Sequence, residues 1–430
     1  MSTMTPTAPS AAPLTGAGVE TTRNWKTAIG YGVFTVIAIV LFGFAHRPGT
    51  ATFRLASQGD FFALPDLPLQ ATATGVVVIV LLAIATVYAV VETRASRRVP
   101  LWLTALFAVV FVVGFLAWAV AGDSITIPGM LVGALGLSVP LIFGALGGVI
   151  SERVGVVNIA IEGQFLAGAF TSALVASITG SAWVGLVGAL VAGMLVSFIL
   201  AAFSIKYLVD QVIVGVVINA FISGLTGFLY SQVLSPNEST LNVGIRFPIV
   251  PIPVLHQIPV IGPIFFEQRV TVYIAYVAVA VVTFCLFKTR WGLRLRSVGE
   301  HPQAADTVGI NVNRTRFWNV SLAGAIAGVG GAYFTLDAVG GFTKDMTAGA
   351  GYIALAAVIF GRWDPIRATM AALLFGFASN LQNALSVVQG SPVPSEFLLM
   401  LPYVVTILAV AGLVGQVRGP AAAGKPYIKS

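Results

Sequence analysis

The sequence has few charged side chains. Asp, Glu, Lys and Arg together make up 9% of its 430 residues, compared with about 25% in a typical soluble domain. Hydrophobic residues account for 57%, and the mean hydropathy is +0.94. Successive apolar runs of roughly 20 residues are long enough to cross a hydrocarbon core about 30 Å thick. Because the alternating pattern of membrane β-strands is missing, we expect an all-α polytopic membrane protein.

Cysteine and histidine are also rare, and the common nucleotide-binding loop is missing. The single cysteine, Cys285, allows no internal disulfide, and the three histidines lie in separate segments, so no metal site is predicted. No Walker A sequence G-x-x-x-x-G-K-[ST] occurs, so the chain cannot bind ATP through that loop. We expect no cofactor and no enzymatic activity. Basic cytoplasmic loops explain the net charge of +7 better than nucleic-acid binding does.

Twelve apolar segments are predicted to span the lipid bilayer. They lie at 27–45, 73–91, 101–121, 129–150, 163–179, 183–203, 211–230, 269–287, 317–338, 348–360, 366–388 and 396–414. With the amino terminus inside, 18 of the 23 Lys and Arg residues fall on the cytoplasmic side, as the positive-inside rule expects. Both termini are therefore predicted to be cytoplasmic, with a flexible tail at 1–26 and a second tail at 416–430.

Two connecting segments are too long to be simple turns. The outer segment 231–268 contains six prolines, which oppose a regular helix and favour extended, stiff chain. The inner segment 288–316 is polar and basic, and loops of this length are usually functional or disordered. Within it, Pro302 and Gly309 predict the start and the end of a short helix.

Two apolar segments share an order of features that suggests an internal repeat. FGALGGVIS (143–151) and AIAGVGGAYF (325–334) each include or adjoin a small-xxx-small pair suited to close helix packing. The pairs are Gly144 and Gly148, and Gly324 and Gly328. The predicted topology runs the two segments in opposite directions, and an inverted repeat places a transport path at the repeat interface. The alternative is that Gly- and Ala-rich membrane helices resemble one another by composition alone.

Polar residues interrupt the apolar runs at ERVGVVNIAIEGQF (152–165) and in mid-span. Asn158 and Glu162 share one face if this stretch is helical. A carboxylate in hydrocarbon costs on the order of 2.5–3.5 kcal/mol or more, so Glu162 is a functional candidate. An equal alternative is that Glu162 caps its own helix at the cytoplasmic surface while Glu152 and Arg153 are solvated. For Asn219 we favour an interhelical hydrogen bond over a substrate contact.

Two sequence patterns together resemble a known family. They are E-R-x-G-V-V-N-I-x-x-E-G-x-x-x-x-G-A-F at 152–170 and W-G-L-R-x-R-x-V-G-E-x-P-x-A-A-x-x-x-G-I at 291–310. They resemble the permease subunits of bacterial ABC importers in the ribose and branched-chain amino-acid permease superfamily, and most closely the nucleoside-type branch. The resemblance covers about 125–415. It implies a second permease subunit, identical or not, cytoplasmic ABC ATPase subunits and an extracytoplasmic substrate-binding lipoprotein, assembled in the bacterial plasma membrane.

The resemblance also assigns roles within the chain. It implies a permease core at 101–415, with two additional membrane helices at 27–100. It implies that the loop 288–316 couples to the ATPase through six residues: Gly299, Glu300, Pro302, Ala304, Ala305 and Gly309. Three alternatives remain open: a permease for simple sugars or another small polar solute, a stand-alone secondary transporter, and a membrane scaffold without transport activity.

Overall fold

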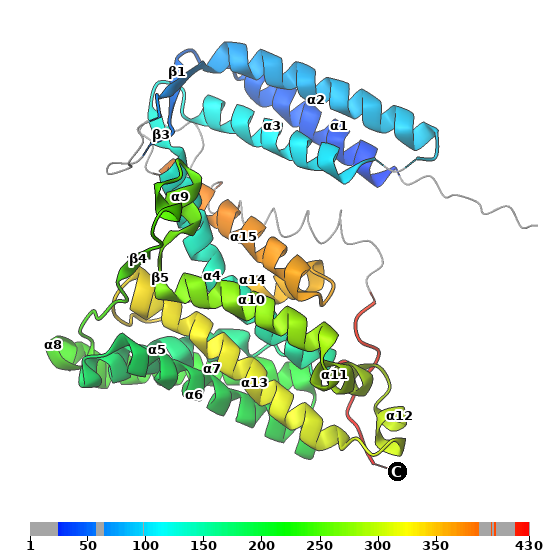
Figure 1. The fold of residues 1–430 in the computed structure, drawn as a ribbon, viewed down its shortest axis with the longest axis vertical. Coiled ribbons are helices and arrows are strands. Elements are labelled where there is room, and N and C mark those ends of the chain that lie inside the picture. The colour runs from blue at the N-terminus through cyan, green and yellow to red at the C-terminus, as the bar shows by residue number, and fades with distance from the viewer. Residues whose placement is uncertain are drawn as a thin grey trace, which may run out of the picture. The chain divides into compact units, whose positions relative to one another are not determined.

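Helices dominate the protein in the computed structural model (Figure 1). The structure describes residues 25–56, 64–97, 99–386, 397, 400 and 418–429. Among these residues, nine helices are long and apolar enough to cross a membrane, which agrees with the expected all-α polytopic class. Helical segments occupy every predicted span from 27–45 to 366–388, while nearly all of the predicted span 396–414 lies outside the described residues.

Contacts divide the chain into two units, of which the first comprises residues 1–47 and 71–118. Its helices are α1 (Lys26–Ala38) with the π-helical extension η1 (Ile39–Phe44), α2 (Ala71–Arg94) and α3 (Leu101–Ala119). Tyr31 of α1 stacks on Phe107 of α3 with ring centroids 4.1 Å apart. The Tyr31 hydroxyl also donates to Thr104 Oγ1 at 3.0 Å. A Cβ on Gly114 of α3 would lie 2.7 Å from Val78 Cγ1 of α2. In the structure α3 therefore packs with the two helices that precede it, whereas the resemblance implied a core beginning at residue 101.

The second unit comprises residues 48–70 and 119–430. Its main helices are α4 (Ile127–Arg153), α5 (Ile161–Thr179), α6 (Ala182–Ala201), α7 (Gln211–Leu229), α10 (Val270–Lys288), α11 (Arg290–Glu300), α12 (Pro302–Thr307), α13 (Val312–Tyr333), α14 (Ala350–Phe360) and α15 (Pro365–Ser386). Three of them continue as π-helical segments, η2 (Ala202–Lys206), η3 (Tyr230–Leu234) and η6 (Phe334–Ala338).

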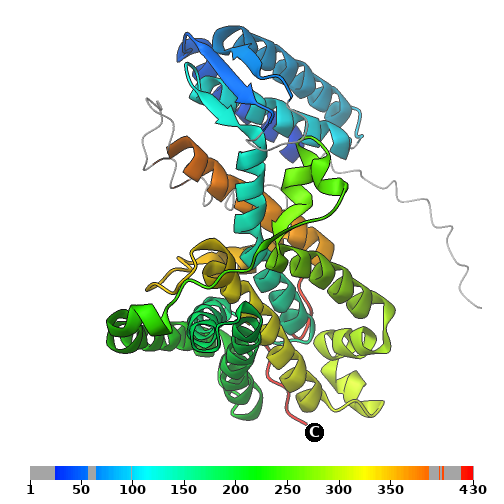
Figure 2. The same ribbon diagram turned by 60° about the vertical axis from the view of Figure 1, so that its left-hand side comes forward.

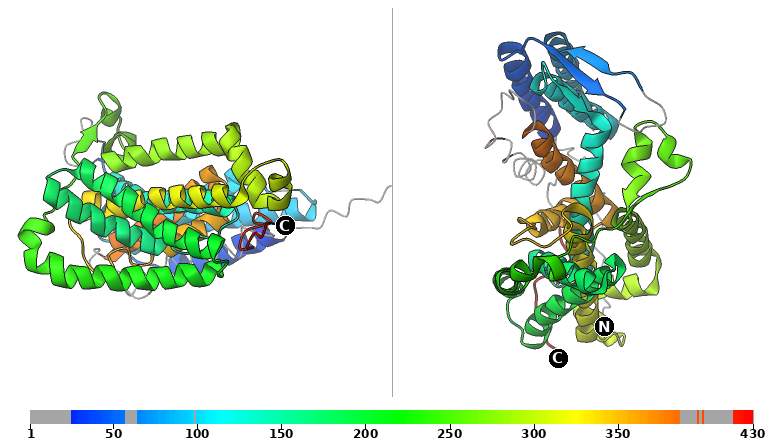
Figure 3. Two further views of the ribbon diagram at one scale, coloured as in Figure 1. Left: turned by 90° about the horizontal axis from the view of Figure 1, so that it is seen from below. Right: turned by 90° about the vertical axis from the view of Figure 1, so that its left-hand side faces the viewer.

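Helix α13 packs against α4, α5 and α6 and so forms the centre of this second unit. The left view of Figure 3 shows α13 (yellow) beside the green helices α5 and α6. On its other side α4 (cyan) packs against α15 (orange), as Figure 2 shows, and α14 packs against both. The polar stretch 152–165, which connects α4 to α5, therefore lies among tightly packed helices.

Both predicted small-residue pairs lie at helix crossings, but against different partners. Gly324 and Gly328 of α13 face α6, where a Cβ on Gly328 would lie 2.2 Å from the Ala189 carbonyl oxygen. Gly144 and Gly148 of α4 face α5 and α14, where a Cβ on Gly148 would lie 2.7 Å from Val358 Cγ2. Real Cβ atoms do not come this close, so any side chain at these positions would push the helices apart.

The structure also contains short strands that the sequence did not predict. A three-stranded sheet has the order β2–β1–β3, formed by β1 (Thr50–Arg54), β2 (Leu67–Gln70) and β3 (Ser124–Thr126). In the proline-rich segment, β4 (Ile249–Pro251) pairs antiparallel with β5 (Glu267–Arg269). The short helices η4 (Ser235–Asn237) and α8 (Glu238–Leu241) precede β4, and η5 (Leu255–Gln257) and α9 (Ile261–Phe265) lie between β4 and β5. Strands of three to five residues are too short for their alternation of side chains to stand out in a sequence.

Candidate functional site

Two helices of the second unit, α5 and α14, begin next to each other around the buried carboxylate of Glu162. The chain leaves α4 through the irregular segment 154–160, where Gly155 takes a φ of +95° that glycine adopts at little cost. It leaves η6 through the irregular segment 339–349 before α14 begins. The first residues of α5, beginning with Ile161, are buried, and so is Gly351 in the first turn of α14. The two helix starts meet around Glu162, and we call this region the polar junction.

The carboxylate of Glu162 caps a helix other than its own. Its Oε1 atom accepts hydrogen bonds from Thr347 Oγ1 at 2.6 Å and from the Gly349 amide at 2.9 Å, and Oε2 accepts from the Gly351 amide at 2.6 Å. The first amides of a helix lack partners within the helix, and its dipole favours negative charge there. The alternative that Glu162 caps α5 at the cytoplasmic surface is therefore wrong, since the side chain is 8% exposed and bonded to the start of α14.

Asn158 pairs with an amide that the sequence did not single out. Asn158 and Gln164 exchange two hydrogen bonds of 3.1 Å, and Gln164 Nε2 also donates to Ser197 Oγ of α6 at 2.9 Å. Both amides are 0% exposed. Because α5 begins only after Asn158, Asn158 and Glu162 do not share a helix face as the sequence suggested. Asn158 instead fixes the irregular segment against α5 and, through Gln164, against α6.

Asn219 connects α7 to both helix starts. Its Oδ1 atom accepts from the Gly163 amide at 2.8 Å, and its Nδ2 group donates to the Ile159 carbonyl at 2.8 Å and to Tyr352 Oη at 3.1 Å. The bonds to Gly163 of α5 and Tyr352 of α14 run between helices, which is the role that the sequence favours for Asn219. Tyr352 is 48% exposed, so the polar junction reaches the surface of the chain at this residue.

Glu152 and Arg153, at the end of α4, hold the connection between α14 and α15. Glu152 Oε2 accepts from Trp363 Nε1 at 2.5 Å, and Arg153 Nε donates to the Trp363 carbonyl at 2.9 Å. The alternative that both residues are solvated is wrong for Glu152, which is 4% exposed, and Arg153 is partly covered. No sequence pattern indicates Trp363 as their partner.

The six residues with an implied coupling role differ in their burial. Gly299 and Ala305 are buried, Pro302 is partly buried, and Glu300, Ala304 and Gly309 are exposed. The short helix predicted between Pro302 and Gly309 is confirmed as α12, and Gly309 takes a φ of +87° after it. A Cβ on Gly299 would lie 1.9 Å from the Arg153 carbonyl oxygen. The α11–α12 connection therefore packs directly on the end of α4, while α12 leaves a surface open.

The C-terminal tail, residues 418–429, lies along the segment with the implied coupling role (Figure 1). The Ala422 amide donates to the Gly299 carbonyl at 2.9 Å, and the Ala421 amide donates to Glu300 Oε2 at 3.2 Å. Arg316 at the start of α13 is 2% exposed and donates from Nη1 to the Lys425 carbonyl at 2.9 Å. The sequence predicts only a tail here, and its apolar residues Ala422 and Tyr427, which are buried in the structure, are its one local sign of packing.

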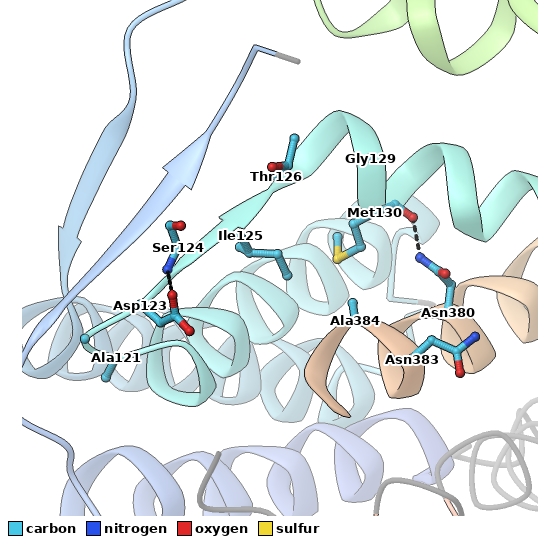
Figure 4. Close-up of a pocket in the computed structure, with 11 residues that line it drawn as sticks. Ala121, Asp123, Ser124, Ile125, Thr126, Gly129, Met130, Asn380, Asn383 and Ala384 are labelled. Atoms are coloured by element: carbon cyan, nitrogen blue, oxygen red, sulfur yellow. Dashed lines mark hydrogen bonds between the residues drawn. The ribbon is translucent and has the colours of Figure 1, made fainter. Parts of the chain in front are cut away.

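A polar cavity of about 890 Å³ opens beside the first residues of α4 and the last residues of α15 (Figure 4). Its polar side chains are those of Asp123, Ser124, Thr126, Asn380 and Asn383. Asn380 Nδ2 donates to the Met130 carbonyl at 2.6 Å. The remaining amide and hydroxyl groups offer both donors and acceptors, beside the carboxylate of Asp123.

Comparison with known proteins relates this chain to transport proteins. Residues 130–410 match the family described as branched-chain amino acid transport system / permease component. The chain is 44% identical over 314 residues to the guanosine ABC transporter permease protein NupQ of Bacillus subtilis, covering 71% of this chain and 97% of the relative. It is 42% identical over 301 residues to the nucleoside ABC transporter permease protein NupC of Lactococcus lactis, covering 68% and 94%.

A third relative has a different substrate in its name. The putative glucose ABC transporter permease protein TsgC13 of Haloferax volcanii is 36% identical over 254 residues, covering 59% of this chain and 77% of the relative. No solved structure matches the chain.

Proposed function

Because this chain belongs to the family of branched-chain amino acid transport system permease components, we propose that it is the permease subunit of an ATP-driven importer for nucleosides. The observation that carries the proposal is the match, over nearly their whole length, to two relatives named as guanosine and nucleoside permeases. The chain forms the translocation pathway with a second permease subunit. Separate ATPase subunits supply the energy, and a substrate-binding lipoprotein delivers the solute.

The orientation in the bacterial plasma membrane follows from the charge distribution of the loops, with both termini in the cytoplasm. The contact between the C-terminal tail and α11–α12 supports this orientation, because it requires both segments to lie on the same side. The cavity around Asn380 then lies on the outer side, where the lipoprotein releases its solute. The segment 231–268 is the docking site that we propose for the lipoprotein.

The polar junction is the part of the pathway that we expect to rearrange during transport. Glu162 joins the starts of α5 and α14 through three hydrogen bonds, and Asn219 ties both to α7. Discontinuous helices of this kind surround the substrate site in many transporters. A change from outward to inward access would turn α14 relative to α5 about this junction, because these bonds keep the two helix starts together.

The contacts of α11 and α12 provide a route from the ATPase to the junction. We propose that the exposed surface formed by Ala304 of α12 and by Gly309 in the turn after it docks on the ATPase. A displacement of α12 reaches the end of α4 through the close contact of Gly299 with Arg153. It then reaches α14 and α15 through Trp363. Close-packed contacts transmit such small displacements because they do not deform continuously.

Uptake measurements test the substrate class. In cells without nucleoside uptake of their own, this chain and its partner subunits should import labelled guanosine, and excess unlabelled nucleoside should block the uptake while excess glucose should not. The second candidate function is a simple-sugar permease, favoured by the relative named for glucose. Uptake of labelled glucose that nucleosides do not inhibit would reject the nucleoside assignment in favour of the sugar.

A further inference from the structure

A second cavity, of about 560 Å³, lies between the end of α6, the start of α13 and the C-terminal tail. Its wall combines the end of α6 with η2, the start of α13 and the last residues of the tail. Three basic and three aromatic side chains line it: Lys206, Arg314, Lys429, Phe317, Trp318 and Tyr427. The remaining lining residues are apolar, apart from one asparagine. The transport function proposed above makes no use of this cavity.

The charge in this cavity is not balanced within the described part of the chain. Lys206 lies over the Tyr207 ring at 5.7 Å and, like Arg314, makes no ion pair among the described residues. Lys429 Nζ lies 3.9 Å from Asp306 Oδ1 but remains 73% exposed. Asp210, on the loop after η2, is occupied as the cap of α7. The cavity therefore attracts an anion, because two of its cations have no carboxylate partner.

The position of the cavity points to the membrane surface. Both α6 with η2 and α13 with η6 are candidate spans, and the cavity lies at their ends on the side of α11, α12 and the tail. Trp318 is 55% exposed and Tyr207 is 63% exposed, and such aromatic residues mark the headgroup level of a bilayer. Apolar residues of η2 and α13 continue from the basic groups along the spanning helices.

We propose that this cavity binds the phosphate headgroup of an anionic phospholipid from the cytoplasmic leaflet. Lys206, Arg314 and Lys429 contact the phosphate, and the exposed faces of Trp318 and Phe203 contact the first segments of the acyl chains. Basic pockets between membrane helices on the cytoplasmic side recognise anionic lipids in this way. A free phosphate offers the same charge without the acyl chains.

Native mass spectrometry of the full-length chain, purified in mild detergent and stripped of lipid, tests the proposal. The chain should retain phosphatidylglycerol in preference to phosphatidylcholine at equal concentration. Each basic residue near an anionic lipid contributes roughly fivefold in affinity, so the double variant Lys206→Gln/Arg314→Gln should bind phosphatidylglycerol on the order of twentyfold more weakly. Its weak binding of phosphatidylcholine should not change.

A matched control removes two positive charges from α11, which lies on the same side of the protein as the cavity but does not line it. The variant Arg290→Gln/Arg294→Gln changes two exposed residues of α11 and should keep the preference for phosphatidylglycerol. Equal binding of both lipids by the wild-type chain would overturn the proposal, as would an equal loss in both double variants. Displacement of phosphatidylglycerol by inorganic phosphate at the same concentration would show a site for a free anion, and would also overturn it.

Discussion

Glu162 is a buried carboxylate whose charge is compensated by backbone amides and a hydroxyl rather than by a cation. Three donors on the segment before α14 and in its first turn point at its two oxygens. Short hydrogen bonds therefore hold the carboxylate in place where two helices begin. The side chain thus sets the distance between α5 and α14.

Replacing Glu162 by Gln tests this role at the scale of one residue. One oxygen becomes an amide group that cannot accept from Thr347, Gly349 or Gly351, so at least one buried donor loses its partner. A lost buried hydrogen bond costs about 1–3 kcal/mol, and the thermal unfolding midpoint of the purified chain should fall. Glu238→Gln on exposed α8 is the matched control and should have no effect. An unchanged midpoint for Glu162→Gln would contradict the role of this carboxylate.

At the scale of elements, the structure separates the buried from the accessible part of the segment 288–316. Gly299 packs on α4 and on the C-terminal tail, and the Glu300 carboxylate accepts a hydrogen bond from the tail. A charge reversal at Glu300 would therefore disturb the tail as well as any partner. The accessible surface belongs to α12 and the turn after it, where Val308 is 75% exposed.

A charge at Val308 should disrupt docking of the ATPase without disturbing the fold. Val308→Asp places a carboxylate on the surface proposed for the ATPase, where it would remain unpaired, so copurification of the ATPase with the permease should fall by about tenfold or more. Val254→Asp is the matched control, since Val254 is 73% exposed in the proline-rich segment. Undiminished copurification with Val308→Asp would place the ATPase on another surface.

At the scale of the whole molecule, the apolar runs predicted the helices because each run must satisfy its own backbone inside lipid. The contacts that build the polar junction could not be predicted in the same way. Glu162 and Gly351 are 189 positions apart. No local sequence pattern shows which distant backbone amides will donate to a given carboxylate. Packing of the C-terminal tail on Gly299 was missed for the same reason. The short helix at Pro302 was predictable because its signals are local.

The membrane orientation can be tested with two exposed valines. After replacement of Cys285 by Ser, single cysteines at Val254 and Val308, which are 73% and 75% exposed, should report opposite sides of the membrane. A membrane-impermeant maleimide should label the Val254→Cys protein in intact cells and the Val308→Cys protein only after permeabilisation. Labelling of both in intact cells would contradict the predicted topology, since it would place α12 outside.

The central claim is that this chain transports nucleosides only as part of an ATP-driven assembly. The most direct measurement is uptake of labelled guanosine by proteoliposomes containing the chain and its partner permease, with the lipoprotein outside. We predict accumulation when the ATPase subunits and ATP are present inside, and none when either is omitted. Accumulation by the chain alone, driven by an ion gradient without ATPase, would contradict the account and identify a secondary transporter.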